Sequence, residues 1–448
     1  MAVKTKDILE GSILKQLTLL FIPIFLGYLC KQLYDTFDAF IVGQYVNKQA
    51  LAAIGGSTSN ITSLLTNFVL GLSAGLTIIM AQLHSRGRED KVLACVQTSF
   101  FVAIVLGLIM TIVGIVTTKS VLELTNVPED VLPYSATYMK LFYIGSIPTL
   151  IYEIGSSLLR AVGDSKRPLY ILIITCVLHI IFDFLFIKVC NFGITGVGLA
   201  YLLSQTISCV LILYIFYKGE DSLSYSFKDF GFDKDMLIKT IKVGLPLGLQ
   251  QVLYSVTNIY IQALINNYQT DVIAASTAYG KLEALFWNFD TAIGIAITTM
   301  LAQNYGAGKI DRFKKIVRVG ICAYMVATAV ISVVNYAFTR EILSIFTTDA
   351  NVIEIGIVMS RFMILCWWQF GFIQIYSAAI KSAGRTLITT VICAVGICAV
   401  RIIYLMVYDC QNFIDVYHSY PLSWVITSLV FVVYYYSGRW LKREQARD

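Results

Sequence analysis

Charged residues are scarce in this sequence. Asp, Glu, Lys and Arg make up 14% of its 448 residues, whereas they make up about 25% of an ordinary soluble domain. Hydrophobic residues account for 57%, and the mean hydropathy is +0.73. The length therefore does not indicate three soluble domains, because this composition is typical of an integral membrane protein.

Several chemical patterns are also missing. The ten Cys lie singly, mostly in apolar runs, without C-x-x-C or metal-ligand spacing, and there are only three His. No G-x-x-x-x-G-K-S/T loop for ATP occurs. The net charge of +6 forms no basic patch suited to nucleic acid. We therefore expect no cofactor, no bound metal and no nucleic-acid partner.

Long apolar segments dominate what is present. A helix needs about 20 residues to cross the hydrocarbon core of a membrane, and the sequence has twelve segments of that kind. The N-terminus lacks a short apolar core followed by a cleavage site, so we expect a mature cytoplasmic end. The predicted spans are 14–43, 50–82, 93–117, 133–159, 167–190, 195–217, 237–266, 272–303, 314–338, 354–380, 385–409 and 417–437.

Basic residues gather in alternate connections between these spans. The connections on the opposite side contain only four basic residues, Lys48, Lys119, Lys188 and Arg340. Cytoplasmic connections carry the excess of Lys and Arg in membrane proteins. The pattern predicts an even number of spans, both termini in the cytoplasm and a multi-pass protein of the cell membrane.

The two halves of the sequence repeat one another. FIPIFLG around Pro23 matches GLPLGLQ around Pro246, and further matches keep an offset of 219 to 223 residues. We predict an N-lobe at 1–217, a cytoplasmic linker at 218–236 and a C-lobe at 237–448. Six spans per half, all entering from the cytoplasm, are typical of transporters that rock around a central site.

Charges inside the spans are the informative ones, since each costs about 2.5 to 3.5 kcal/mol at the bilayer centre. Lys31, Asp35 and Asp38 share one helix face, so we predict a structural ion pair between Lys31 and Asp35. We predict ion-coupling roles for Asp38 and Asp183, because a buried carboxylate can alternate between charged and neutral states. His179 is one turn from Asp183. We expect it to be either a member of the ion-coupling site or a hydrogen-bonded helix histidine.

Aromatic and polar side chains of the C-lobe suggest a substrate cavity. FWNFD and CWWQFGFIQIY bring rings and amides to similar depths, which suits planar or cationic organic molecules. Positions at the membrane interface explain many such rings equally well. The cavity candidates are Tyr34, Glu283, Phe286, Asp290, Trp368 and Gln369.

Four motifs, in order and with the duplication, carry a family resemblance. They are FDAFIVG at 37–43, LLRAVGDSKRP at 158–168, HIIFDFLFI at 179–187 and the A-Q loops after the second and eighth spans. The chain resembles transporters of the MATE (multidrug and toxic compound extrusion) family over essentially its whole length. The resemblance implies an all-α fold of twelve transmembrane helices in two six-helix lobes. It also implies cation-coupled antiport of organic substrates.

The resemblance also implies roles for individual residues. Asp38 falls on the essential aspartate of the first helix, Asp183 on the carboxylate of the fifth, and Pro23 on the proline at which the first helix bends. His179 stands where the family usually has Asn, and Tyr201 where a smaller residue is expected. Because Na+ prefers oxygen ligands, the His favours H+ as the coupling ion, with Na+ as the alternative.

The predicted function is therefore secondary active antiport, without ATP, that exports organic and chiefly cationic compounds by rocking of the lobes. We expect small organic substrates and membrane lipids as partners, and a monomer. A lipid or polymer-precursor flippase would need fourteen spans and a cationic cavity. A major-facilitator transporter would need a basic loop that RGREDK poorly replaces. A membrane enzyme would need a reactive group near an interface.

Overall fold

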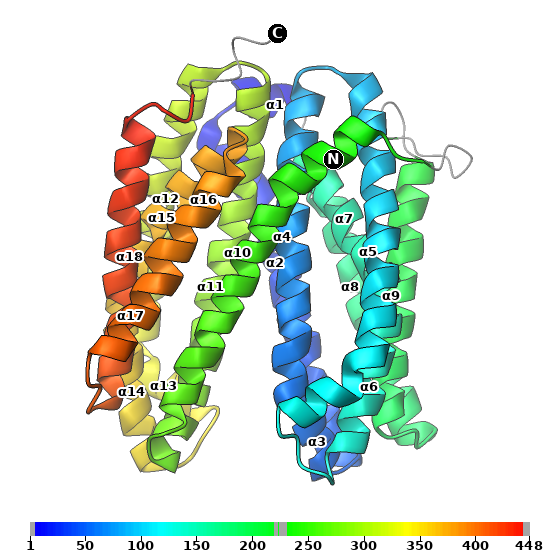
Figure 1. Cartoon of the computed structure of the whole chain (residues 1–448), viewed down its shortest axis with the longest axis vertical. Coiled ribbons are helices and arrows are strands. Elements are labelled where there is room, and N and C mark those ends of the chain that lie inside the picture. The colour runs from blue at the N-terminus through cyan, green and yellow to red at the C-terminus, as the bar shows by residue number, and fades with distance from the viewer. Residues whose placement is uncertain (1–4, 219–222, 224–230, 442–448) are drawn as a thin grey trace. The chain divides into compact units, whose positions relative to one another are not determined.

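The computed structural model describes residues 5–218, 223 and 231–441, and the regular structure of these residues is entirely helical (Figure 1). The prediction of an all-α protein is confirmed. Most of the predicted linker, at 219–222 and 224–230, lies outside the described residues. Of the four basic residues that predict a cytoplasmic C-terminus, Arg439 is described, whereas Lys442, Arg443 and Arg447 also lie outside the described residues.

The helices follow the two halves of the sequence. The first half contains α1 (Thr5–Glu10), α2 (Ile13–Tyr45), α3 (Lys48–Gly55), α4 (Ser57–Ser85), α5 (Glu89–Leu124), α6 (Leu132–Ile144), α7 (Ser146–Ala161), α8 (Lys166–Asp183), the π-helical η1 (Phe184–Val189) and α9 (Ile194–Tyr217). The second half contains α10 (Lys234–Ile265), α11 (Thr270–Gly306), α12 (Ile310–Ala337), α13 (Thr339–Ser344), α14 (Ala350–Cys366), the 3-10 turn η4 (Trp367–Gln369), α15 (Phe370–Ser382), α16 (Thr386–Cys393), the π-helical η5 (Ala394–Ala399), α17 (Val400–Val407) and α18 (Phe413–Tyr436).

Ten helical stretches of the described residues are long and apolar enough to cross a membrane. Two predicted spans, 133–159 and 237–266, are not among the ten. The first is divided at Gly145, between α6 and α7. The second is the 32-residue helix α10, which carries Lys, Gln and Asn side chains along its length. A multi-pass helical protein is confirmed, whereas the count of twelve spans stays a prediction.

The chain forms two compact units. Unit 1 consists of Met1–Thr5 and Ile22–Gly248, and unit 2 consists of Lys6–Phe21 and Leu249–Asp448. One boundary lies between Thr5 and Lys6 at the start of α1, and the other two fall inside α2 and α10, close to Pro23 and Pro246, the two prolines that the repeat pairs. Each of these helices therefore belongs in part to both units. The lobes predicted from the repeat, at 1–217 and 237–448, stay a prediction.

Glycines allow two helices of unit 1 to approach each other closely. Gly71 and Gly75 on α4 face the segment of α10 that belongs to unit 1. A Cβ atom at Gly75 would lie 2.5 Å from the Cα atom of Gly244, and one at Gly71 would lie 2.4 Å from the Leu247 carbonyl oxygen. Backbones this close leave no room for a side chain, as in the small-residue contacts of other membrane helices.

We expect Gly75→Ala to destabilise the protein by about 1 to 3 kcal/mol, because the added methyl group meets backbone atoms and forces the helices apart. Gly280→Ala is the matched control, since no atom lies within 4 Å of a Cβ at that helical position. It should be neutral or stabilising by up to about 1 kcal/mol. Thermal unfolding of the purified variants in detergent measures the stability change of each. Equal unfolding midpoints for the two variants would contradict the close backbone contact at Gly75.

Candidate functional site

Asp38 and Asp183 meet around one histidine in unit 1. The Nε2 atom of His179 lies 2.8 Å from Asp38 Oδ1 and 3.3 Å from Asp183 Oδ2. Asp38 comes from α2, whereas His179 and Asp183 lie one turn apart on α8. His179 is 3% exposed, Asp183 is fully buried, and Asp38 is 9% exposed. The structure thus brings together the three residues that the sequence predicted for ion coupling.

A serine fixes the orientation of the imidazole. His179 Nδ1 lies 3.2 Å from Ser204 Oγ on α9, and that hydroxyl donates its hydrogen to the Ala200 carbonyl at 2.7 Å. This hydrogen bond holds Nδ1 toward Ser204, so Nε2 faces the two carboxylates. Ser204 was not predicted, because a serine in an apolar helix gives no signal of what its hydroxyl contacts.

The charge of Asp183 has to be balanced within the site. Within the described residues, neither oxygen of Asp183 has a hydrogen-bond partner. A buried carboxylate without hydrogen bonds is costly as an isolated anion. It is neutralised either by a protonated imidazole at 3.3 Å or by a proton of its own. Shifting one proton within this group changes its hydrogen bonds, whereas adding or removing one also changes its total charge.

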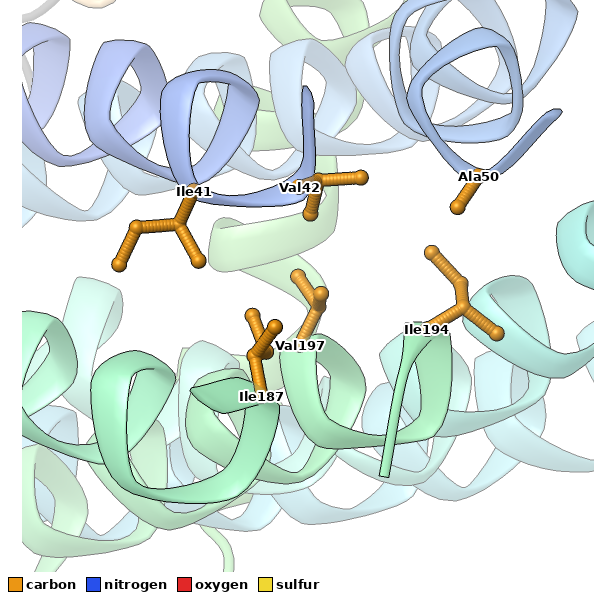
Figure 2. Packing of buried hydrophobic residues seen from close by; sticks show 6 residues of the cluster. All are labelled: Ile41, Val42, Ala50, Ile187, Ile194 and Val197. Atoms are coloured by element: carbon orange, nitrogen blue, oxygen red, sulfur yellow. The ribbon is translucent and has the colours of Figure 1, made fainter. Parts of the chain in front are cut away.

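A cluster of buried apolar side chains follows the site along α2 and η1 (Figure 2). Val42 is one turn beyond Asp38 on α2, and Ile187 is one turn beyond Asp183 on η1. They belong to a buried cluster whose members point toward one another from α2, α3, η1 and α9. The members of this cluster are Ile41, Val42, Ala50, Ile187, Ile194 and Val197. The ring of Tyr34, a predicted cavity residue, lies 5.0 Å from the His179 ring.

Lys31 lies against an acid that its spacing did not predict. Its Nζ atom is 3.8 Å from Glu153 Oε1 on α7, and Asp35 on its own helix is exposed. The pairing of Lys31 with Asp35 stays a prediction. Pro23 lies inside the continuous helix α2, so its role as a hinge also stays a prediction.

Asp290 is enclosed by two donors in unit 2. The Tyr324 hydroxyl donates to Oδ1 and the Gln374 amide donates to Oδ2, each at 2.8 Å. Asp290 is 4% exposed. A Cβ atom at Gly294 would lie 2.4 Å from the Gln374 amide nitrogen, so this glycine leaves room for the donor. The sequence predicted Asp290 as a cavity candidate but neither of its partners.

The other predicted cavity residues of unit 2 have different environments. Phe286 is fully buried and stacks on Trp367 with ring centroids 4.5 Å apart, so it contributes to the core of unit 2. Trp368 is 48% exposed. Glu283 and Gln369 are half-buried, and each has a buried oxygen without a hydrogen-bond partner among the described residues. The structure does not gather these residues into one site.

Comparisons with known proteins agree with this arrangement. The MatE family model matches residues 23–185 and 246–407. The chain is 27% identical to the probable multidrug resistance protein YoeA of Bacillus subtilis, over 98% of this chain and 96% of that protein. It is equally identical to the probable multidrug resistance protein YpnP of the same organism, over 98% of each.

A solved structure described as the outward-facing conformation of a multidrug resistance MATE family transporter has the same fold. Its TM-score is 0.91 at 18% identity, over 99% of this chain and 100% of that one. The family model covers both halves of the repeat, and these relatives are transporters and not enzymes. This chain, a multi-pass cell-membrane protein that needs no cofactor, therefore belongs to the MATE family of multidrug efflux transporters.

Proposed function

We propose that the chain is a secondary antiporter that exports organic compounds in exchange for protons. One observation carries the proposal: His179 Nε2 lies between an oxygen of Asp38 at 2.8 Å and an oxygen of Asp183 at 3.3 Å. All three side chains are buried or nearly so. A group of this kind binds a proton and releases it when the conformation changes, which is what coupling requires.

The histidine favours H+ over Na+ as the coupling ion. Carboxylate, carbonyl and water oxygens are the ligands of hard cations. The ligand atoms of the three residues lie within 4.8 Å of one another, so the imidazole occupies space that an ion would share. If Nε2 is protonated, its N–H repels a cation. If Nε2 is unprotonated, it offers nitrogen where Na+ prefers oxygen.

The proposed cycle links the charge of this site to the substrate. With the site deprotonated and negative, an organic cation has a counter-charge in Asp38. A proton from outside then neutralises the group and changes the hydrogen bonds that hold α2 to α8. We propose that α2 shifts about Pro23, where the helix passes from one unit to the other, and that the cation is released. Twelve spans and cytoplasmic termini complete the proposed topology.

Everted membrane vesicles test this function. We expect uptake of a fluorescent organic cation when the vesicles hold an inward-acid pH gradient, and no uptake when a Na+ gradient of equal size replaces it. Vesicles from cells without the protein give the background. Uptake driven only by Na+ would contradict proton coupling, and uptake by neither gradient would contradict antiport.

A further inference from the structure

The internal repeat relates the site of unit 1 to a set of residues in unit 2. HIIF at 179–182 aligns with RIIY at 401–404, an offset of 222 residues. YLLS at 201–204 aligns with YPLS at 420–423, on helices α9 and α18 that have 24 residues each. Arg401 and Ser423 therefore take the places in unit 2 that His179 and Ser204 take in unit 1.

The two pairs make the same contact. Arg401 Nε donates to Ser423 Oγ at 3.2 Å, and Ser423 donates its own hydrogen to the Tyr420 carbonyl at 2.7 Å. In unit 1, His179 Nδ1 likewise forms a hydrogen bond with a serine that donates to a backbone carbonyl. In each unit a serine thus holds one nitrogen of a basic side chain and leaves the others to face elsewhere.

The acids of the first site have no counterpart in the second. The repeat places Ile261 opposite Asp38 and Leu405 opposite Asp183, at offsets of 223 and 222. Both are buried, at 4% and 7% exposure. Arg401 is 4% exposed, and no carboxylate of the described residues lies within 4.0 Å of it. A buried cation without an acid is costly in a membrane helix.

One aromatic ring stacks on this guanidinium. Its central carbon lies 4.0 Å from the centroid of the Tyr420 ring, whose centroid is 5.8 Å from that of Trp424. Glu283 on α11 interacts electrostatically with Arg401 but forms no ion pair with it. An arginine that stacks its face on a ring keeps its N–H edge for the two oxygens of a carboxylate or phosphate. Nε is the one nitrogen that a described side chain occupies.

We propose that Arg401 binds the anionic group of the exported compound, so that the substrates include planar aromatic compounds with a carboxylate or phosphate group. The anion supplies the charge that Ile261 and Leu405 do not, and the half-buried ring of Tyr420 contacts its aromatic part. The inference rests on the proposed function only in that the bound compound is one that the chain exports. Binding itself needs no ion gradient, so it is tested separately.

A matched pair of dyes tests the site. One is a rhodamine with a free carboxylate, and the other is the methyl ester of the same rhodamine. Fluorescence anisotropy measures their affinities for the purified full chain in detergent. The native chain should bind both dyes. Arg401→Gln should weaken binding of the free acid by about tenfold or more, the value of a hydrogen bond to a charged group, and leave the affinity for the ester within about twofold.

Two further variants separate recognition from structure. Arg401→Lys should restore part of the affinity for the free acid, because it keeps the charge but not the fork of donors. Arg340→Gln, which removes the partner of Glu354 at the exposed ends of α13 and α14, should change neither affinity. Equal loss of both dyes in Arg401→Gln would assign the arginine a structural role and overturn the proposal. Failure of the native chain to bind the free acid would overturn it too.

Discussion

Asp38→Asn should remove nearly all export driven by a pH gradient. Asp38 lies 2.8 Å from His179 Nε2, and an amide in its place can neither take up nor release a proton, so the charge of the site should no longer follow the external pH. A coupling free energy of about 1 to 3 kcal/mol corresponds to a change of about 5-fold to 150-fold, and we expect a loss at the upper end of that range. Gradient-driven uptake of a cationic dye into everted vesicles measures it.

Asp35→Asn is the matched control for this variant. The two aspartates lie on the same helix, three residues apart, but Asp35 is exposed and Asp38 is 9% exposed. We expect Asp35→Asn to keep most of the native uptake. Native uptake by Asp38→Asn, at equal amounts of protein in the membrane, would remove Asp38 from the mechanism.

His179→Asn should change the ion that drives export. The asparagine oxygen would stand beside the carboxylates of Asp38 and Asp183, which together form the oxygen environment that Na+ prefers. Uptake driven by a pH gradient should fall by about tenfold or more, in the range of a typical coupling free energy. A Na+ gradient should then drive uptake that the native chain does not show.

Binding of Na+ to this variant can be measured without transport. An ion that binds the folded protein stabilises it according to its concentration and affinity. Added NaCl should therefore raise the unfolding temperature of His179→Asn in detergent above the effect of equal KCl, and it should not do so for the native chain. The same Na+ effect in both proteins would show that His179 does not select the ion.

Parts of the site follow from the sequence because they are local. His179 and Asp183 are four residues apart, so any helix places them on one face, and the length of the apolar segment predicted that helix. The family resemblance singled out Asp38 and Asp183, and the structure joins them through His179. No single-sequence pattern links Asp38 with a residue 141 positions away, because that contact depends on how α2 packs against α8.

The environments of polar residues in unit 2 show the same limit. Asp290 stood out as a charge inside a span, but its donors Tyr324 and Gln374 come from α12 and α15. The sequence placed Phe286 beside a cavity because aromatic residues suit one, whereas it stacks on Trp367 in the core. Residue type predicts what a side chain can bind. Only packing decides whether it faces a ligand or another helix.

Proton release on substrate binding tests the central claim most directly. The purified native chain, in weakly buffered detergent solution without Na+, is mixed with the methyl-ester rhodamine while a pH indicator is followed. The account predicts that the cation displaces protons from the group of Asp38, His179 and Asp183, and that Asp38→Asn releases none. Dye binding by the native chain without proton release would contradict the account, and so would undiminished release from Asp38→Asn.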